Sequence, residues 1–196
     1  MEHWTIPHLE SSHYRILGID PGTETLGVAI LDLDIHTGEI VRSIAHTLVA
    51  SHSPYFNREL ANVHGHKAAR LEAHKLNLFH LFKTAQPSLI ASEAPFYNRF
   101  RPNAYAPLVE TMMVIRDALR QYDWHKHLMV LDPPRVKKAV GAKGNAKKDE
   151  VQAALLKHLK VIRMDKTTFM KLDEHSVDAL CVAYAHYQFL TKKITF

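Results

Sequence analysis

Two apolar runs joined by a tight turn constrain the fold of this chain more than any other feature. In YRILGIDPGTETLGVAIL (residues 14–31) the first run ends in Asp20, a Pro-Gly pair follows at once, and a second run begins at Leu26. This pattern predicts two strands joined by a turn, with a carboxylate where the first strand stops. A carboxylate there costs free energy unless a charged group meets it. Asp20 is therefore the first candidate functional residue.

The next part of the chain alternates between strand-like and helix-like patterns. A third strand is expected over residues 40–49, so that the first three strands form an antiparallel meander. Apolar residues recur at helical spacing over residues 57–84, where Gly65 is expected to bend or split the helix. A short apolar strand over residues 88–93 again ends in an acid, Glu93.

Helical patterns dominate the remainder of the chain. Asp132 is followed by two prolines, which indicates a helix start with Asp132 as its N-cap. Arg135 opens a segment rich in Lys and Gly, with two glycines between two helical pieces. The expected elements are helices over residues 106–122, 149–159 and 173–190, and a buried strand over residues 127–131.

Together these elements predict an α/β fold with one five-stranded mixed sheet flanked by helices. Three antiparallel strands come first, and two parallel strands complete the sheet. The first and fourth strands then lie side by side, and both end in an acid at the edge where open α/β sheets bind ligands. The 196 residues suffice for one domain, expected over residues 14–196, after a flexible arm over residues 1–13.

The composition bounds the partners and the compartment. Lys and Arg number 25 against 20 Asp and Glu, and the net charge of +5 is compatible with a polyanionic partner without requiring one. The single Cys181 excludes an intramolecular disulfide framework and fits a reducing compartment. No apolar run approaches the roughly 20 residues of a membrane span, and the start of the chain lacks a signal-peptide pattern. A cytoplasmic protein without a membrane segment is expected.

Four polar side chains are expected to converge on one edge of the sheet. Asp20 and Glu93 close two neighbouring strands, while His175 and Asp178 stand three residues apart and share one face of the last helix. If that helix crosses the sheet edge, three carboxylates meet, and they repel one another unless cations lie between them. Such clusters suit Mg²⁺ or Mn²⁺, and two ions support phosphodiester hydrolysis. Singly, each acid also has a structural explanation, in a turn or at a helix end.

Four segments resemble the motifs of a known family, the RuvC-type Holliday junction resolvases of the RNase H-like superfamily. In chain order they are GIDPGTETLGVAI, QPSLIASEAPF, VKKAVGAKGNAKKDEV and HSVDALCVAYAH. The resemblance covers about residues 15–186. It implies an RNase H-like fold and a metal-dependent endonuclease that resolves four-way DNA junctions by paired cuts, with two Mg²⁺ or Mn²⁺ ions in each active site.

The resemblance also implies roles for the four converging residues. Asp20, Glu93 and Asp178 correspond to the metal-binding, catalytic acids of the family. His175 occupies the place of a further Asp, a position where some members have His. Because His175 replaces a carboxylate with a nitrogen ligand, we expect Mn²⁺ to be comparatively more effective here than in an all-carboxylate relative. The alternative is that His175 only caps the helix or packs.

DNA contacts follow from the same resemblance. Phe96 matches the aromatic residue that contacts unpaired bases at the crossover, with core packing as the alternative, and base stacking of this kind tolerates any sequence. Lys137 and Lys148 match basic positions that grip phosphates or stabilise charge at the scissile one. The full expected DNA-binding set is Phe96, Tyr97, Arg99, Lys137, Lys138, Lys143, Lys147 and Lys148.

A symmetric homodimer is implied as well, since the family acts on junctions with near two-fold symmetry. The helix over residues 106–122 is the resembling dimer element. Met112, Met113 and Ile115 are its candidate apolar patch, although an ordinary core face explains them equally well.

Other functions remain open at this point. A nuclease for flaps or replication forks would need the same acids and the same basic surface. The D-x-G-T turn also occurs in actin-like and sugar-kinase proteins, where it cradles ATP phosphates, but those proteins need two such lobes. A catalytically silent DNA-binding module is the third alternative, and the retained acids oppose it.

Overall fold

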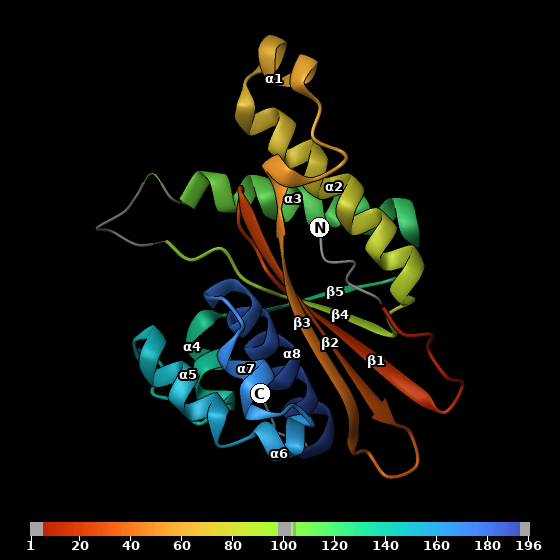
Figure 1. The fold of residues 1–196 in the computed structure, drawn as a ribbon, viewed down its shortest axis with the longest axis vertical. Coiled ribbons are helices and arrows are strands. Elements are labelled where there is room, and N and C mark those ends of the chain that lie inside the picture. Colours follow the sequence, from red (N-terminus) through yellow and green to blue (C-terminus); the bar gives the residue numbers. More distant parts are fainter. Residues whose placement is uncertain (1–5, 98–102, 104, 193–196) are drawn as a thin grey trace.

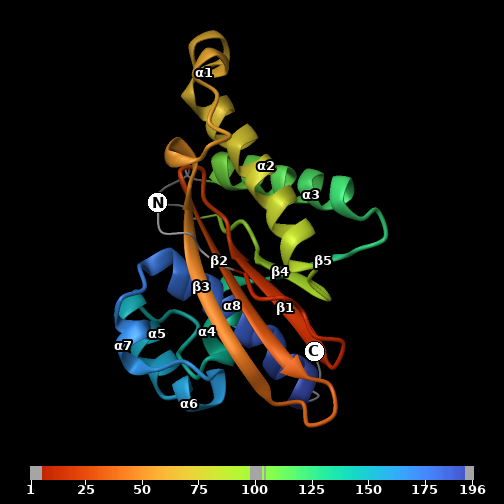
Figure 2. The same ribbon diagram turned by 45° about the vertical axis from the view of Figure 1, so that its right-hand side comes forward.

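A five-stranded mixed sheet runs through the molecule, with helices on both of its faces (Figure 1; Figure 2). The structure is a computed structural model that describes residues 6–97, 103 and 105–192. The strands lie in the order β3-β2-β1-β4-β5. Their bounds are β1 (His13–Asp20), β2 (Thr25–Asp34), β3 (Ile40–Val49), β4 (Leu89–Glu93) and β5 (Leu128–Leu131). The helices are η1 (Ala50–His52), α1 (Arg58–His64), α2 (His66–Ala85), α3 (Tyr105–Tyr122), α4 (Pro133–Ala139), α5 (Lys148–Leu156), α6 (Leu159–Ile162), α7 (Lys166–Met170) and α8 (Glu174–Lys192).

The expected topology is confirmed. Strands β1, β2 and β3 form an antiparallel meander, and β4 pairs in parallel with both β1 and β5. Gly65 divides the expected long helix into α1 and α2, and its φ of 88° is a conformation that favours glycine. Helix α1 and the first part of α2 project beyond the sheet, as the top of Figure 1 shows.

Alternate residues of β1 supply the two faces of the sheet. Leu17 and Ile19 pack in one core with α2 and α3, whereas Ile16 packs in the other core with α4 to α8. Side chains of a strand alternate between faces, so Asp20 is on the same side as Ile16, toward α8. The fold therefore turns the acid at the end of β1 toward the last helix.

A buried ion cluster joins three strands at the other end of the sheet. The guanidinium of Arg15 donates to both carboxylate oxygens of Asp32 at 2.6 and 2.9 Å, and Arg42 donates to Oδ2 of Asp32 at 2.6 and 2.8 Å. Arg15 and Asp32 are fully buried. Burial opposes ionisation of Asp32, but the two arginines hold its pKa below the usual value.

One local expectation is wrong, and another is confirmed in position only. Strand β5 is only partly buried: it forms an edge of the sheet, Leu131 is buried, and Met129 and Val130 are 42% and 37% exposed. Asp132 stands at the N-cap position of α4, but its side chain makes no capping hydrogen bond. The two prolines that follow have no N–H to donate, and the first available one, of Arg135, donates to the backbone oxygen of Asp132 at 2.9 Å.

The face of α3 is divided between core and surface. Met112 and Ile115 are buried, so the core explains these two residues. Met113 is 52% exposed. The described helices include none that is long and apolar enough to cross a membrane.

Part of the expected arm is tied to the domain. Residues 1–5 lie outside the described residues, and the flexibility of the arm stays a prediction. Farther along, the carbonyl oxygen of Pro7 accepts a hydrogen bond from Arg15 at 3.0 Å, and that of His8 accepts one from Arg42 at 3.3 Å. These bonds join the arm to the buried ion cluster.

Candidate active site

The parallel pairing of β1 with β4 brings two acids to one edge of the sheet. Asp20 and Glu93 directly follow a paired position of the two strands. Gly18 in β1 and Ala91 in β4 face α8, and each of the two acids lies two residues farther along its strand. Because side chains alternate along a strand, both carboxylates are directed toward the α8 side.

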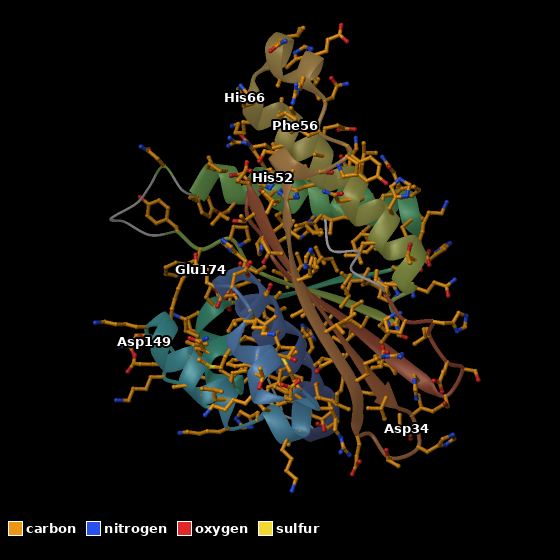
Figure 3. The ribbon with its side chains drawn as sticks, viewed as in Figure 1. Asp34, His52, Phe56, His66, Asp149 and Glu174 are labelled. Carbon is orange, nitrogen blue, oxygen red and sulfur yellow. The ribbon has the colours of Figure 1, made fainter. Side chains whose placement is uncertain are left out.

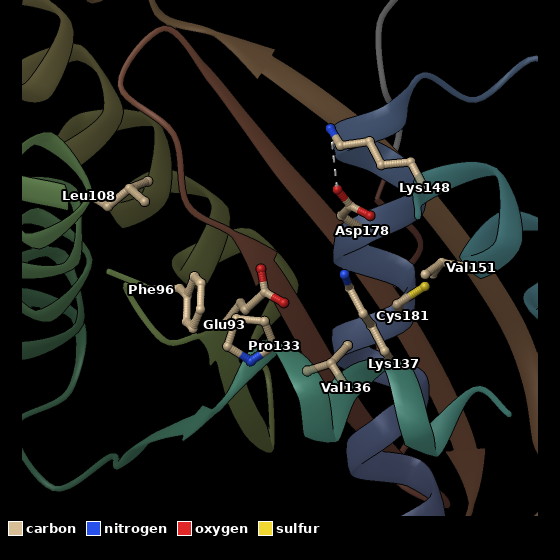
Figure 4. Close-up of a pocket in the computed structure, with 10 residues that line it drawn as sticks. All are labelled: Glu93, Phe96, Leu108, Pro133, Val136, Lys137, Lys148, Val151, Asp178 and Cys181. Atoms are coloured by element: carbon tan, nitrogen blue, oxygen red, sulfur yellow. Dashed lines mark ion pairs between the residues drawn. The ribbon is translucent and has the colours of Figure 1, made fainter. Parts of the chain in front are cut away.

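Two glycines let α8 lie directly against these strands. An added Cβ at Gly18 would lie 2.5 Å from a backbone oxygen of α8, and one at Gly27 of β2 would lie 2.0 Å from the carbonyl oxygen of His175. A larger residue at either position would push the helix off the sheet. The close approach carries His175 and Asp178 to the edge that holds Glu93, and Figure 4 shows Glu93 and Asp178 on opposite sides of one pocket.

The acids at this edge sense one another's charge. Burial raises the pKa of Glu93 to about 8, and the charges of Asp20 and Asp178 add to the rise. Burial, and then the charge of Asp20, raises the pKa of Asp178 to about 6. Ionising all three carboxylates together therefore costs free energy until a cation offsets their repulsion.

The donor set fits a divalent cation that prefers oxygen ligands. Asp20, Glu93 and Asp178 offer carboxylate oxygens and His175 offers a ring nitrogen, a combination that suits Mg²⁺ or Mn²⁺. Within the described parts of the chain, no three His, Cys, Asp or Glu side chains already lie close enough to hold one ion. That all four residues bind metal stays a prediction.

His175 links the last helix to the first hairpin. Its Nδ1 lies 2.9 Å from Oδ2 of Asp20, and this hydrogen bond raises the pKa of His175. Its Nε2 lies 2.7 Å from Oγ1 of Thr25, the first residue of β2. The imidazole is therefore more than a helix cap, because it contacts an acid of the site directly.

Two lysines from the Lys/Gly segment flank the acids. Nζ of Lys148 lies 2.8 Å from the carboxylate of Glu174 and 4.0 Å from that of Asp178. Partial burial lowers the pKa of Lys148, but the neighbouring carboxylates raise it by more. The net pKa is above that of an ordinary lysine, so the side chain is charged at neutral pH. Nζ of Lys137 donates to a backbone carbonyl oxygen of the following loop at 2.8 Å. Its charge opposes the rise in the pKa of Glu93.

The other expected basic residues stand apart from the acids. Lys138, Lys143 and Lys147 are exposed on the same segment and do not line the pocket. The backbone N–H of Lys147 donates to the carboxylate of Glu150 at 2.7 Å, which stabilises the start of α5. Arg99 lies outside the described residues.

An aromatic side chain, that of Phe96, lies beside Glu93 in the pocket at this edge of the sheet. Phe96 is 57% exposed, so the alternative that it belongs to the core is wrong. Tyr97 is exposed to the same degree and packs edge-on against Tyr105, with ring centroids 5.8 Å apart. Figure 4 shows the pocket, which is lined by Glu93, Phe96, Leu108, Pro133, Val136, Lys137, Lys148, Val151, Asp178 and Cys181.

Two contact residues were missed by reasoning from the sequence. The sequence identifies neither Glu174 nor Thr25 as a contact residue of the site. Glu174 directly precedes His175, and Thr25 lies within the first motif. Their positions in the sequence are the signal that could have identified them. Their partners are distant, since Thr25 and His175 are 150 residues apart. Figure 3 places Glu174 at the start of α8, far from Asp34 at the other end of β2.

Comparisons with known proteins identify the family of this chain. The family model for crossover junction endodeoxyribonuclease RuvC matches residues 16–186. The RuvC of Stenotrophomonas maltophilia is 29% identical over 172 residues, which cover 88% of this chain and 87% of the relative. The RuvC of Gloeobacter violaceus is 25% identical over 169 residues, covering 86% and 85%.

Solved structures show the same fold. T. thermophilus RuvC in complex with Holliday junction substrate superposes with a TM-score of 0.62 at 16% identity, covering 92% of this chain and 96% of that one. The yeast mitochondrial Holliday junction resolvase Ydc2 gives 0.58 at 13% identity, covering 92% and 81%. The family match includes the positions of Asp20, Glu93, His175 and Asp178. This chain therefore belongs to the RuvC family of crossover junction endodeoxyribonucleases.

Proposed function

We propose that this protein is a metal-dependent, structure-selective DNA endonuclease that resolves four-way junctions by paired hydrolysis of phosphodiester bonds. The observation that carries the proposal is that Asp20, Glu93 and Asp178 lie near enough at one edge of the sheet for their charges to raise the pKa of Glu93, with Lys137 and Lys148 beside them. Membership of the RuvC family supports it, as does the likeness to a RuvC solved with a Holliday junction substrate.

Asp20, Glu93 and Asp178, with His175 as a nitrogen ligand, would hold two Mg²⁺ or Mn²⁺ ions. When bound, such ions supply an activated water and stabilise charge on the leaving oxygen. Lys148 stands next to the acids with its ammonium charged, where it would meet the scissile phosphate. In the structure the ammonium of Lys148 pairs with the carboxylates of Glu174 at 2.8 Å and Asp178 at 4.0 Å.

Exposed residues around the pocket would hold the DNA. Lys138, Lys143, Lys147 and Arg99 would contact phosphates along the junction arms. Phe96 presents a ring beside Glu93 on which an unpaired base can stack, and the exposed ring of Tyr97 would share this role. A DNA substrate fits the cytoplasm of a bacterial or phage-infected cell.

A homodimer would let two active sites cut symmetrically related strands of one junction. Met113 of α3 offers an exposed apolar contact, whereas Met112 and Ile115 are occupied in the core. Resolution of junctions by a monomer, which has a single active site, would contradict this part of the proposal.

The direct test is cleavage of labelled synthetic DNA by the purified protein in Mg²⁺ or Mn²⁺. We expect paired nicks across a four-way junction and much slower cutting of flaps, forks and plain duplex. Equal or faster cutting of flaps or forks would favour the alternative of a nuclease for other branched DNA. An actin-like phosphotransferase is not proposed further, because the family match accounts for the same hairpin motif.

Replacing Phe96 with Ala is expected to weaken junction binding by about 1–3 kcal/mol, because an exposed ring that stacks on a base is lost. Binding of plain duplex should change little, since duplex offers no unpaired base. The measurement is a binding titration of both DNAs without divalent metal. Phe96→Trp, which keeps a stacking surface, is the matched control. An equal loss for junction and duplex would contradict the stacking role.

Stabilisation by metal is expected to increase with pH. Glu93 has a folded-state pKa of about 8 against 4.5 for an ordinary Glu, so above pH 4.5 the metal-free fold loses stability progressively until about pH 8. Asp178, with a pKa of about 6 against 3.8, contributes in the same direction. Because metal binds the ionised carboxylates, it restores more stability at pH 8 than at pH 5.

Thermal unfolding with and without Mn²⁺ at these two pH values measures the effect. The Mn²⁺-induced rise in melting temperature should be several times larger at pH 8. In Glu93→Gln the metal-free protein should lose less stability over this range, because the group with the larger shift is gone. A rise of the same size at both pH values would contradict the prediction.

A further inference from the structure

The ring of His175 is held at both of its nitrogens. Nδ1 lies 2.9 Å from Oδ2 of Asp20, and Nε2 lies 2.7 Å from Oγ1 of Thr25. Oε1 of Glu174 lies farther from Nε2, at 3.7 Å, and the carboxylate of Glu174 is paired with Lys148 at 2.8 Å. Within the described residues, Thr25 is therefore the group that makes a hydrogen bond to the outer nitrogen.

The hydroxyl of Thr25 is placed by a rigid part of the backbone. Thr25 begins β2 and pairs with Val49 of β3. The turn before it is closely packed, because an added Cβ at Gly22 would lie 2.1 Å from the carbonyl oxygen of Thr25. The preceding residue, Glu24, accepts the backbone N–H of Ala50 at 2.8 Å through its carbonyl oxygen, and its carboxylate pairs with Arg70 of α2 at 2.6 Å. The hairpin thus presents the hydroxyl in a defined position.

A hydroxyl suits either tautomer of the imidazole. It donates to Nε2 when that nitrogen carries a lone pair, and it accepts when Nε2 carries the hydrogen. In the second case Nδ1 keeps its lone pair on the side of Asp20. A histidine that binds metal through one nitrogen commonly donates its other N–H to a neighbouring group, which fixes the orientation of the ring.

We propose that Thr25 is a positioning residue for the active site, whose hydroxyl holds the His175 ring with Nδ1 toward Asp20 and the metal-binding acids. The inference rests on the proposed function, in which His175 and Asp20 bind divalent metal. Its consequence is that loss of the Thr25 hydroxyl weakens metal binding and junction cleavage together, without weakening DNA binding. Partners of this type typically contribute about 10–100-fold to metal affinity or activity.

The test compares Thr25→Val, which keeps the shape but loses the hydroxyl, with Thr25→Ser, which keeps the hydroxyl. Mn²⁺ binding to the DNA-free full-length protein is measured by calorimetry, and junction cleavage is measured across a Mn²⁺ titration. We expect about 10–100-fold weaker Mn²⁺ binding in Thr25→Val, a matching shift in the Mn²⁺ requirement for cleavage, and values close to wild type in Thr25→Ser. Metal-free junction affinity and melting temperature should stay unchanged in both.

A second comparison separates positioning from packing. In a His175→Ala background, Thr25→Val should add no further loss of Mn²⁺ binding, because its partner is gone. Wild-type Mn²⁺ binding in Thr25→Val, or an equal defect in Thr25→Ser, would overturn the inference while leaving the proposed function intact. If Thr25→Val does not fold, Thr25→Ala takes its place in the same comparison. A wild-type protein that binds no Mn²⁺ would overturn the metal site itself, and this inference with it.

Discussion

Asp20→Asn and Glu93→Gln are each expected to reduce junction cleavage by about 10²–10⁴-fold while leaving junction binding in place. Each substitution replaces a carboxylate at the sheet edge with an amide of almost the same shape, which is a weak ligand and carries no charge. The labelled four-way junction is incubated with each variant in Mg²⁺ and in Mn²⁺, and single-turnover rates are compared with wild type. Binding is measured without divalent metal.

The melting temperature of Glu93→Gln separates a loss of catalysis from a loss of folding. Burial and the charges of Asp20 and Asp178 disfavour ionised Glu93, so Glu93→Gln should melt no lower than wild type in metal-free buffer at pH 8. Lost activity then cannot be assigned to unfolding. Glu72→Gln, an exposed acid paired with Lys75 on α2, is the matched control and should cut at the wild-type rate. Full activity in Asp20→Asn or Glu93→Gln would remove that residue from the catalytic set.

Asp32→Ala is expected to destabilise the fold by about 3–5 kcal/mol, since it leaves buried Arg15 without its counter-ion. Arg42 loses the same partner but is partly exposed, so water compensates for part of its loss. For a domain of this size the corresponding drop in melting temperature is about 6–20 °C. Thermal and urea unfolding of the metal-free protein give both quantities.

A surface ion pair provides the comparison. Asp117 pairs with Arg120 three residues away on α3, and both side chains are about half exposed. Asp117→Ala should therefore cost no more than about 1 kcal/mol. Equal effects of the two substitutions would mean that the buried ion cluster contributes no more than a surface pair.

Much of the fold followed from local patterns. Apolar runs of strand length, interrupted by turn residues, predicted the order and direction of the strands, and Gly65 divided a long helical pattern as expected. The strand-terminal positions of Asp20 and Glu93 predicted that both acids would meet at one edge. These predictions held because alternation along a strand and parallel pairing are properties of the backbone.

The failures had a different cause. The apolar pattern of β5 could not reveal that the strand lies at the edge of the sheet, with Met129 and Val130 partly exposed. The half-buried character of a strand depends on its neighbours, which a local pattern does not contain. Asp132 takes the N-cap position as predicted, but its side chain makes no capping hydrogen bond, because Pro134 has no N–H and that of Arg135 donates to the backbone oxygen of Asp132.

By itself the sequence determined which residues could do chemistry and at which strand ends and helix face they stand. Only the tertiary structure decided how they meet. Gly18 and Gly27 admit α8 against the sheet, which brings His175 within hydrogen-bonding distance of Asp20 and Thr25. Contacts between residues some 150 positions apart depend on close packing between elements, where a single Cβ would displace the helix, and that packing exists only in the folded chain.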